Sequence, residues 1–192
     1  MTLILASSSP RRKQMLTQLG YQFECLSPYV DESRLVGENA INYVERIAIK
    51  KGEHVFNQIQ NSTAAVILAS DTIVCFENEI LLKPENYDVF RVNMQKLSDN
   101  WHQVITSVYV KSPRQTKLVT VTTNVKFRNI TVQEIQNYWH TGEPLDKAGG
   151  YAIQGIGAGF VESIEGSYSS VVGLPLTQTI ALLRQFDIDY LS

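Results

Sequence analysis

Short apolar runs alternate with longer amphipathic stretches through the first half of the chain. Residues 3–6 and 64–69 are apolar over the length of a strand, and 22–26 also has the length of a strand, whereas 10–19 and about 39–59 carry apolar residues at helical spacing. Strands that alternate with helices of this length are typical of an α/β fold. We therefore expect a sheet with flanking helices.

Turn and capping residues divide the second half of the chain. Glu77-Asn78 separates two strand-length runs, as in a hairpin. Thr131 and Glu134 have the spacing of a capping box, in which each side chain bonds to the backbone of the other residue where a helix begins. The pattern predicts a hairpin of 73–76 with 79–82, β-rich stretches over 104–111 and 117–127, and helices over 87–97, 131–140 and 176–186.

Glycine is distributed unevenly along the chain. Eight of the 11 glycines fall between residues 142 and 173, where we expect tight turns or close approaches of the backbone. The total length of 192 residues is that of one domain, so we expect a single domain over 1–192, and two compact lobes around a cleft stay possible within it.

The charge balance argues against a protein that holds nucleic acid by general electrostatics. Seventeen Lys and Arg residues face 19 Asp and Glu residues, for a net charge of -2, and binding to a phosphate backbone normally needs a positive surplus. The apolar runs are much shorter than the ~18 residues that span a bilayer, and the first residues resemble a strand rather than a signal peptide. We expect a cytoplasmic protein with neither a nucleic-acid nor a membrane partner.

The cysteines and histidines give no metal-site pattern. Cys25 and Cys75 lie 50 residues apart in strand-like stretches, which disfavours a disulfide framework and a structural zinc site. His54, His102 and His140 share no ligand spacing, and we interpret them as surface or packing residues.

The segment between the first strand and the first helix is a candidate anion site. Ser9 suits an N-cap and Pro10 the first helical position. Free backbone N–H groups at that end, with the hydroxyl of Ser8 and the guanidinium groups of Arg11 and Arg12, would suit a phosphate. An ordinary capped helix with exposed arginines is the alternative, and the segment lacks the glycines and lysine of a P-loop.

Two acidic positions could carry chemistry. Asp71 follows the strand over 64–70, at the carboxyl end where open α/β sheets place ligands, and a carboxylate there could bind hydrated Mg²⁺ or orient a water molecule. Asp31-Glu32 follows the second strand as a further pair of oxygen ligands. The structural alternatives are a turn-forming aspartate and a solvated loop.

Further cations and an amide complete the candidates. Lys51 and Lys83, together with the two arginines of the first helix, could converge on one polyphosphate. Within 142–155, a buried Gln154 amide could recognise the edge of a base through one donor and one acceptor.

These motifs, taken in order and spacing, resemble those of Maf proteins, and the resemblance covers nearly the whole chain. The matching segments are 7–12, Asp31-Glu32, Arg46-Ile47-Ala48 with Lys51, Ser70-Asp71-Thr72, Lys83-Pro84, 142–155, and 165–168 with 171–176.

The resemblance implies a hydrolase that cuts nucleoside triphosphates between the α and β phosphates, releasing a nucleoside monophosphate and pyrophosphate. It also implies a mixed sheet with flanking helices similar to that of inosine triphosphate pyrophosphatases, two lobes around a central cleft, and a homodimer. Mg²⁺ or Mn²⁺ held by Glu32 and Asp71 is expected, with Asp71 as general base. The implied substrate-binding residues are Ser8, Arg11, Arg12, Lys51, Thr72, Lys83 and Gln154, of which Arg11, Thr72 and Gln154 are linked to base choice.

The motif details resemble the branch of the family that acts on dTTP and UTP. That branch carries Ser-Pro-Arg-Arg, Asp-Thr and Lys-Ala-Gly-x-Tyr-x-Ile-Gln-Gly, all of which are present. The branch acting on 7-methyl-GTP has a tryptophan after the Ser-Pro and a glutamine after the aspartate, and this chain has neither. The alternatives are a 7-methyl-GTP pyrophosphatase and a non-catalytic nucleotide sensor that regulates septum formation; modified pyrimidine nucleotides are possible further substrates.

The chain also departs from the family pattern. Asp99, Asn100, Trp101 and Ser107 replace a glycine, a basic residue, a threonine and a second glycine. Loss of the basic residue could weaken a phosphate contact or shift base preference. Gly52 stands where alanine is usual, which we expect to cost about 1 kcal/mol of helix stability.

Overall fold

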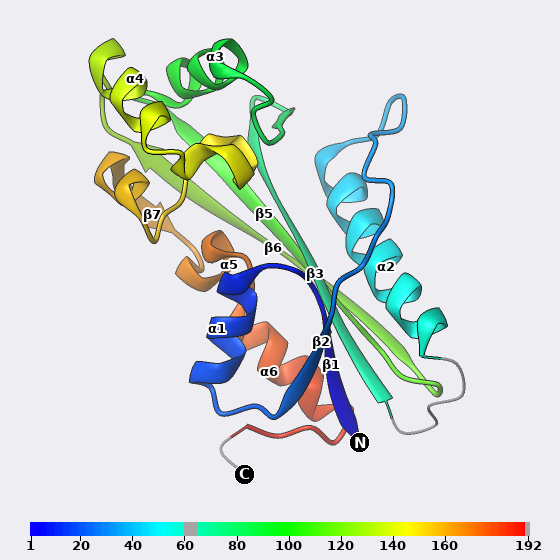
Figure 1. Ribbon diagram of the computed structural model, residues 1–192. Helices are drawn as coiled ribbons and strands as arrows, with labels where there is room; N and C mark the ends of the chain where they lie inside the picture. The colour runs from blue at the N-terminus through cyan, green and yellow to red at the C-terminus, as the bar shows by residue number, and fades with distance from the viewer. Residues whose placement is uncertain (60–64, 191–192) are drawn as a thin grey trace. The chain divides into compact units, whose positions relative to one another are not determined.

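The computed structural model describes residues 1–59 and 65–190, which form a mixed α/β fold (Figure 1). Within these residues a seven-stranded sheet has the order β2-β1-β3-β5-β6-β7, and β4 pairs with β3. The strands are β1 (Thr2–Ala6), β2 (Phe23–Leu26), β3 (Ala65–Phe76), β4 (Glu79–Leu81), β5 (Trp101–Lys111), β6 (Thr116–Phe127) and β7 (Val161–Glu165).

The helices follow the same order along the chain. The α-helices are α1 (Pro10–Gln18), α2 (Ala40–Gln58), α3 (Tyr87–Leu97), α4 (Val132–His140), α5 (Tyr168–Val172) and α6 (Leu176–Arg184). The glycine-rich segment forms the short 3-10 helices η1 (Glu143–Asp146), η2 (Ala148–Gly150) and η3 (Ile156–Phe160). None of the helices in the described ranges is both long and apolar enough to cross a membrane.

The described residues divide into two compact units. The first takes its residues from Met1–Asp71, Thr106–Val121 and Gly173–Ser192, and the second from Thr72–Ile105 and Thr122–Val172.

In the first unit, β1 is paired in parallel with β2 on one side and β3 on the other. Figure 1 shows α2 on one face of these strands and α1 with α6 on the other. The apolar face of α2 packs on the sheet, because burying that stripe removes it from water. The resulting core cluster consists of Ile4, Ala6, Ala48, Val55, Ala65, Ile67, Ala69 and Tyr109.

Gly52 makes room for a tyrosine at this interface. A Cβ atom on Gly52 would lie 2.4 Å from Cδ1 and 2.8 Å from Cε1 of Tyr109. The tyrosine hydroxyl donates a hydrogen bond to Glu53, and Lys111 forms an ion pair with the same carboxylate. The glycine that we expected to weaken the helix therefore also allows α2 to approach β5.

The second unit is built around an aromatic cluster. Phe90 of α3 lies with its ring centroid 5.1 Å from that of Trp139 on α4. The ring of His102 packs against those of Phe127 and Tyr151, and its Nε2 bonds to the Tyr151 hydroxyl at 2.8 Å. Burial lowers the pKa of His102 to about 3, so this histidine is neutral and is a packing residue, as expected.

The clustered glycines of the second unit serve tight turns and close approaches. Gly149 and Gly150 have φ of 66° and 81°, where a side chain is strained. A Cβ atom on Gly149 would lie 2.8 Å from Val74, and one on Gly150 would lie 2.8 Å from Phe90. The expectation for this segment is thus confirmed.

Local signals located most elements correctly. The helix over 87–97, the capping box at Thr131 and Glu134, and the hairpin at Glu77-Asn78 are all present. Both hairpin residues have positive φ, 47° and 68°, as a type I′ hairpin turn requires. Cys25 is exposed and Cys75 is buried, and among the described residues neither forms a disulfide. The patterns missed β7 and α5, and residue 64, the expected start of the third strand, lies outside the described residues.

Candidate active site

The prediction that Asp71 follows the end of its strand is wrong, because β3 continues without a break through Asp71 to Phe76. The polar triplet 70–72 looked like a strand end, but tertiary partners allow the strand to pass through it. Ser70 is fully buried and its hydroxyl donates to the carbonyl of Gly173 at 3.1 Å. The neighbouring strand β1 does end nearby, at Ala6 opposite Ala69. Asp71 therefore lies just past the carboxyl end of β1.

Lys51 joins two carboxylates of the first unit. Its Nζ lies 2.7 Å from Oδ1 of Asp71 and 2.8 Å from Oε1 of Glu32. The side chains of Lys51 and Asp71 are only 12% and 10% exposed, whereas that of Glu32 is 43% exposed. Three predicted site residues from a loop, a helix and a strand thus come together.

The electrostatics of this cluster favour proton transfer at Asp71. Burial raises the pKa of the Asp71 carboxyl above its ordinary value, and the positive charges of Lys51 and Arg12 oppose this shift without cancelling it. A carboxylate with a raised pKa is a stronger base than an ordinary aspartate. The arrangement can therefore orient a water molecule and accept its proton.

Arg12 is anchored inside the protein rather than exposed. Its Nε donates to the carbonyl of Gly173 at 2.8 Å, and its Nη1 donates to the Ser7 hydroxyl at 3.4 Å. The same Gly173 carbonyl also accepts the hydrogen bond from Ser70. This one carbonyl therefore connects α1 and β3 to the segment before α6. Burial lowers the pKa of Arg12, against the opposing effect of Asp71.

The loop before α1 has the predicted helix start. The Ser9 side chain accepts a hydrogen bond from the Arg12 backbone N–H, and Pro10 occupies the first turn. Ser8 is exposed and Arg11 half-buried. These residues leave a helix N-terminus with a hydroxyl and a guanidinium at the surface, which is a favourable environment for an anion.

The other predicted site residues belong to the second unit. Thr72 is half-buried in β3, and Lys83 is exposed just before Pro84. Gln154 is also exposed, between η2 and η3. The expectation of a buried Gln154 amide is therefore wrong, because the turns that bury the neighbouring Tyr151 and Ile153 leave this side chain at the surface.

The carboxylates of the first unit fit a metal that is bound chiefly by its substrate. Among the described residues no three His, Cys, Asp or Glu side chains cluster as a complete metal site. The carboxylates of Glu32 and Asp71 nevertheless both form ion pairs with the ammonium group of Lys51. Mg²⁺ is commonly held by one or two carboxylates and completed by phosphate oxygens and water, so this donor set suits it.

Comparison with known sequences assigns the family. Residues 2–186 match the family described as Maf-like protein. The chain belongs to the Maf family. A Maf relative from Hahella chejuensis, named dTTP/UTP pyrophosphatase, is 46% identical over 97% of this chain and 92% of its own. Another of the same name, from Idiomarina loihiensis, is 48% identical over 98% of this chain and 96% of its own.

The solved structures that are similar to this Maf chain include the following two. The Ham1 protein of Staphylococcus aureus aligns with a TM-score of 0.46 and 15% identity, over 66% of this chain and 72% of its own. A nucleoside-triphosphatase, or dITP/XTP pyrophosphatase, from Mycobacterium abscessus aligns with a TM-score of 0.46 and 12% identity, over 97% of this chain and 96% of its own.

The structure explains three departures from the Maf pattern. Asp99 has φ of 58°, a conformation that favours the usual glycine, and Lys126 bonds to both its carbonyl and its carboxylate. The Asn100 amide donates to two carbonyls near the end of α3. The Ser107 hydroxyl is buried and bonds to Thr120 at 2.7 Å. Each replacement is accommodated by hydrogen bonds to its own surroundings.

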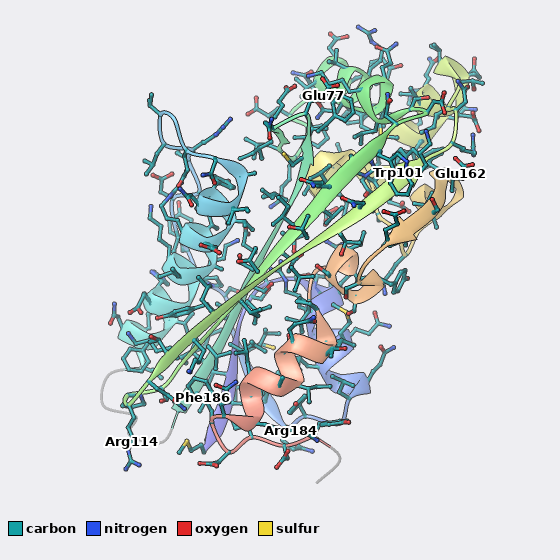
Figure 2. All side chains as sticks on the ribbon, turned by 180° about the vertical axis from the view of Figure 1, so that it is seen from behind. Glu77, Trp101, Arg114, Glu162, Arg184 and Phe186 are labelled. Atoms are coloured by element: carbon teal, nitrogen blue, oxygen red, sulfur yellow. The ribbon has the colours of Figure 1, made fainter. Side chains whose placement is uncertain are left out.

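The fourth departure lies at the surface. Trp101 begins β5 and is 45% exposed (Figure 2). It lines a hollow of about 420 Å³ together with His102, Gln103, Asn124 and Glu165. Nothing else in the structure explains the choice of tryptophan at this position.

Sequence reasoning gave no individual role to three polar side chains of α2. Tyr43, Arg46 and Lys50 each donate a hydrogen bond to the loop that carries Glu32. Their spacing of three and four residues places them on one face of the helix, which is the signal that could have revealed them.

Proposed function

We propose that this Maf protein is a metal-dependent dTTP/UTP pyrophosphatase. The observation that carries the proposal is the buried Asp71 carboxylate, which shares the ammonium group of Lys51 with Glu32, in a chain 44–48% identical to relatives named dTTP/UTP pyrophosphatase. Its substrates would be dTTP, UTP and modified pyrimidine nucleotides, and its products a nucleoside monophosphate and pyrophosphate.

In the proposed reaction Asp71 orients a water molecule and takes its proton. The water oxygen forms a bond to the α-phosphorus, the bond from that phosphorus to the bridging oxygen breaks, and pyrophosphate leaves with the bonding electrons. Lys51 and Arg12 place positive charge beside Asp71, and positive charge near a departing phosphate stabilises the transition state.

Glu32 and Asp71 are the residues that would hold Mg²⁺ or Mn²⁺. A divalent cation, when bound, supplies positive charge that neutralises phosphate oxygens. The family resemblance adds Ser8, Arg11, Thr72, Lys83 and Gln154 as substrate-binding residues, with Arg11, Thr72 and Gln154 influencing base choice. We also propose the homodimer that the family resemblance implies and the cytoplasmic location that the sequence predicts.

The test is release of pyrophosphate from a panel of dTTP, UTP, CTP, a modified pyrimidine nucleotide and 7-methyl-GTP, with and without Mg²⁺. Asp71→Asn should lower turnover by about 100-fold or more while nucleotide still binds. Asp187→Asn is the matched control, because Asp187 is exposed and has a positive φ that asparagine also adopts readily. Normal turnover in Asp71→Asn would contradict the assigned base.

Other outcomes of the same panel would replace the proposal. Preference for 7-methyl-GTP would place the protein in the other branch. Nucleotide binding without release of pyrophosphate would indicate a non-catalytic nucleotide sensor, and no requirement for a divalent cation would remove the assigned metal.

A further inference from the structure

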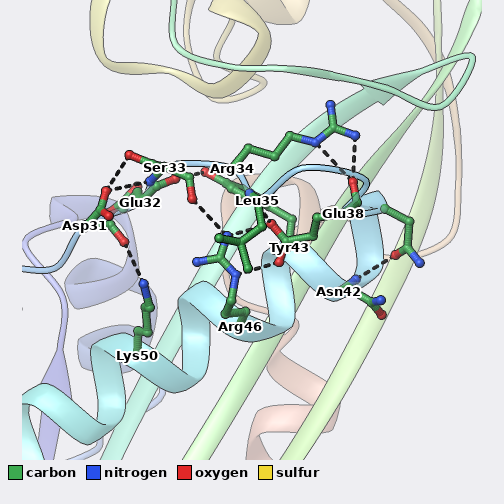
Figure 3. A network of polar contacts seen from close by, with 11 residues as sticks. Asp31, Glu32, Ser33, Arg34, Leu35, Glu38, Asn42, Tyr43, Arg46 and Lys50 are labelled. Atoms are coloured by element: carbon green, nitrogen blue, oxygen red, sulfur yellow. Dashed lines mark hydrogen bonds and ion pairs between the residues drawn. The ribbon is translucent and has the colours of Figure 1, made fainter.

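Three donors of α2 hold three consecutive carbonyl groups of the loop before it (Figure 3). Lys50 donates to the carbonyl of Asp31 at 3.3 Å, Tyr43 to that of Glu32 at 2.9 Å, and Arg46 to that of Ser33 at 3.0 Å. The loop at these positions has no regular secondary structure. Its backbone path therefore depends on side chains from the helix.

Arg46 also fixes the far end of the same loop. Its Nε and Nη2 bond to the two carboxylate oxygens of Glu38 at 2.5 and 2.6 Å. The Glu38 side chain is 7% exposed and also accepts a hydrogen bond from the backbone N–H of Leu35. A planar guanidinium can hold a carboxylate and a carbonyl together in one fixed geometry, which a lysine cannot reproduce.

The loop's own contacts leave Glu32 as the side chain that reaches the active site. Asp31 turns back on the loop, where its Oδ1 accepts bonds from the Ser33 N–H at 2.9 Å and the Ser33 hydroxyl at 2.6 Å. Glu32 instead extends to Lys51, one residue after Lys50 on α2. The backbone on both sides of Glu32 is thus held while its carboxylate pairs with Lys51.

We propose that Arg46, assisted by Tyr43 and Lys50, is a positioning residue that places the Glu32 carboxylate beside Lys51 and Asp71. The inference rests on the proposed function, in which Glu32 takes part in nucleotide hydrolysis. Arg46 acts on the reaction only through Glu32, so its loss matters only while Glu32 is present.

A double-mutant cycle on dTTP hydrolysis tests this dependence. At limiting Mg²⁺, Arg46→Met should lower kcat/KM by about 10- to 100-fold, the usual effect of losing a group that orients a metal ligand. Tyr43→Phe should lower it by about five-fold, the loss of one hydrogen bond. In the Glu32→Gln background, Arg46→Met should not lower kcat/KM further. If the double variant instead shows the product of the two single losses in kcat/KM, the proposal is overturned.

Two further variants separate positioning from general support of the fold. Arg46→Lys should have a kcat/KM little higher than that of Arg46→Met, because lysine keeps the positive charge but loses the bidentate contact with Glu38. Arg184→Met is the matched control, because Arg184 lies in α6 and pairs with Asp189. It should leave kcat/KM within about two-fold of the wild-type value.

Hydrogen exchange gives a readout that does not need catalysis. In Arg46→Met, amides of residues 31–38 should exchange faster by about ten-fold or more, and those in β1 should be unchanged. Unchanged exchange over 31–38 would refute the positioning role even if the enzyme is active. Faster exchange in a protein whose wild type releases no pyrophosphate would support the loop contacts and refute the proposed function instead.

Discussion

Gly52→Ala should destabilise the protein even though alanine is the better helix former. Gly52 lies inside α2, where replacing glycine by alanine normally stabilises by about 1 kcal/mol. Here the new Cβ would lie 2.4 Å from a ring carbon of Tyr109. Such a separation is far inside van der Waals contact, so either the ring or the helix has to move.

The ring has little freedom to move. Tyr109 is 5% exposed, belongs to the core cluster, and bonds through its hydroxyl to Glu53. Forcing an extra carbon into a packed core costs about 1–3 kcal/mol. Set against the helix gain of about 1 kcal/mol, Gly52→Ala should lower the free energy of unfolding by up to about 2 kcal/mol.

Urea unfolding of four proteins measures the coupling. Gly52→Ala is compared in the wild-type chain and in a Tyr109→Ala background, where the ring is absent and alanine should stabilise by about 1 kcal/mol. The two effects should thus differ by about 1–3 kcal/mol. An equal stabilisation in both backgrounds would refute the argument that Tyr109 requires the glycine.

Three further predictions follow from charges and backbone conformation. Lys51→Met should lower the free energy of unfolding by about 3 kcal/mol in urea titrations, because it leaves the buried Asp71 carboxylate unpaired. The hydrogen bond from Arg46 lowers the pKa of Glu38 from 4.5 to about 2. The Glu38–Arg46 pair therefore stabilises the fold fully above pH 4.5, and this stabilisation is lost as the pH falls to about 2. In Arg46→Met, the free energy of unfolding should depend less on pH over this acid range. Asp99→Ala should cost about 1 kcal/mol of thermal stability because of the positive φ, and Asp99→Gly less than half of that.

Elements governed by local chemistry could be predicted from the sequence. The start of α4 depends on a capping box in which Thr131 and Glu134, two residues within a segment of four, are each other's partners. The hairpin turns at two residues with positive φ, Glu77 and Asn78, and asparagine adopts this conformation more readily than most residues. In both cases the partners are close in sequence, so the pattern contains the information.

Features that depend on distant partners could not be predicted in the same way. The sequence predicts that the strand ends at Ser70, because it does not show that Gly173 accepts the serine's hydrogen bond or that Lys51 pairs with Asp71. Buried polar groups are accepted in a strand only when such partners exist. For Gln154, residue type indicated recognition chemistry but could not indicate exposure, which depends on the turns around it.

Asn100 and Ser107, two of the residues that depart from the Maf pattern, form hydrogen bonds outside the carboxylate cluster of Glu32, Lys51 and Asp71. Asn100, which replaces a basic residue, directs its amide to backbone carbonyls of Lys96 and Ser98 rather than to a charged group. Ser107 bonds to Thr120, whose hydroxyl proton goes to Glu45 at 2.6 Å, so the serine must be the donor in its own bond. Neither residue bonds to Glu32, Lys51 or Asp71 in these contacts. The substitutions therefore alter local packing and hydrogen bonding while the residues proposed to carry the reaction keep their partners.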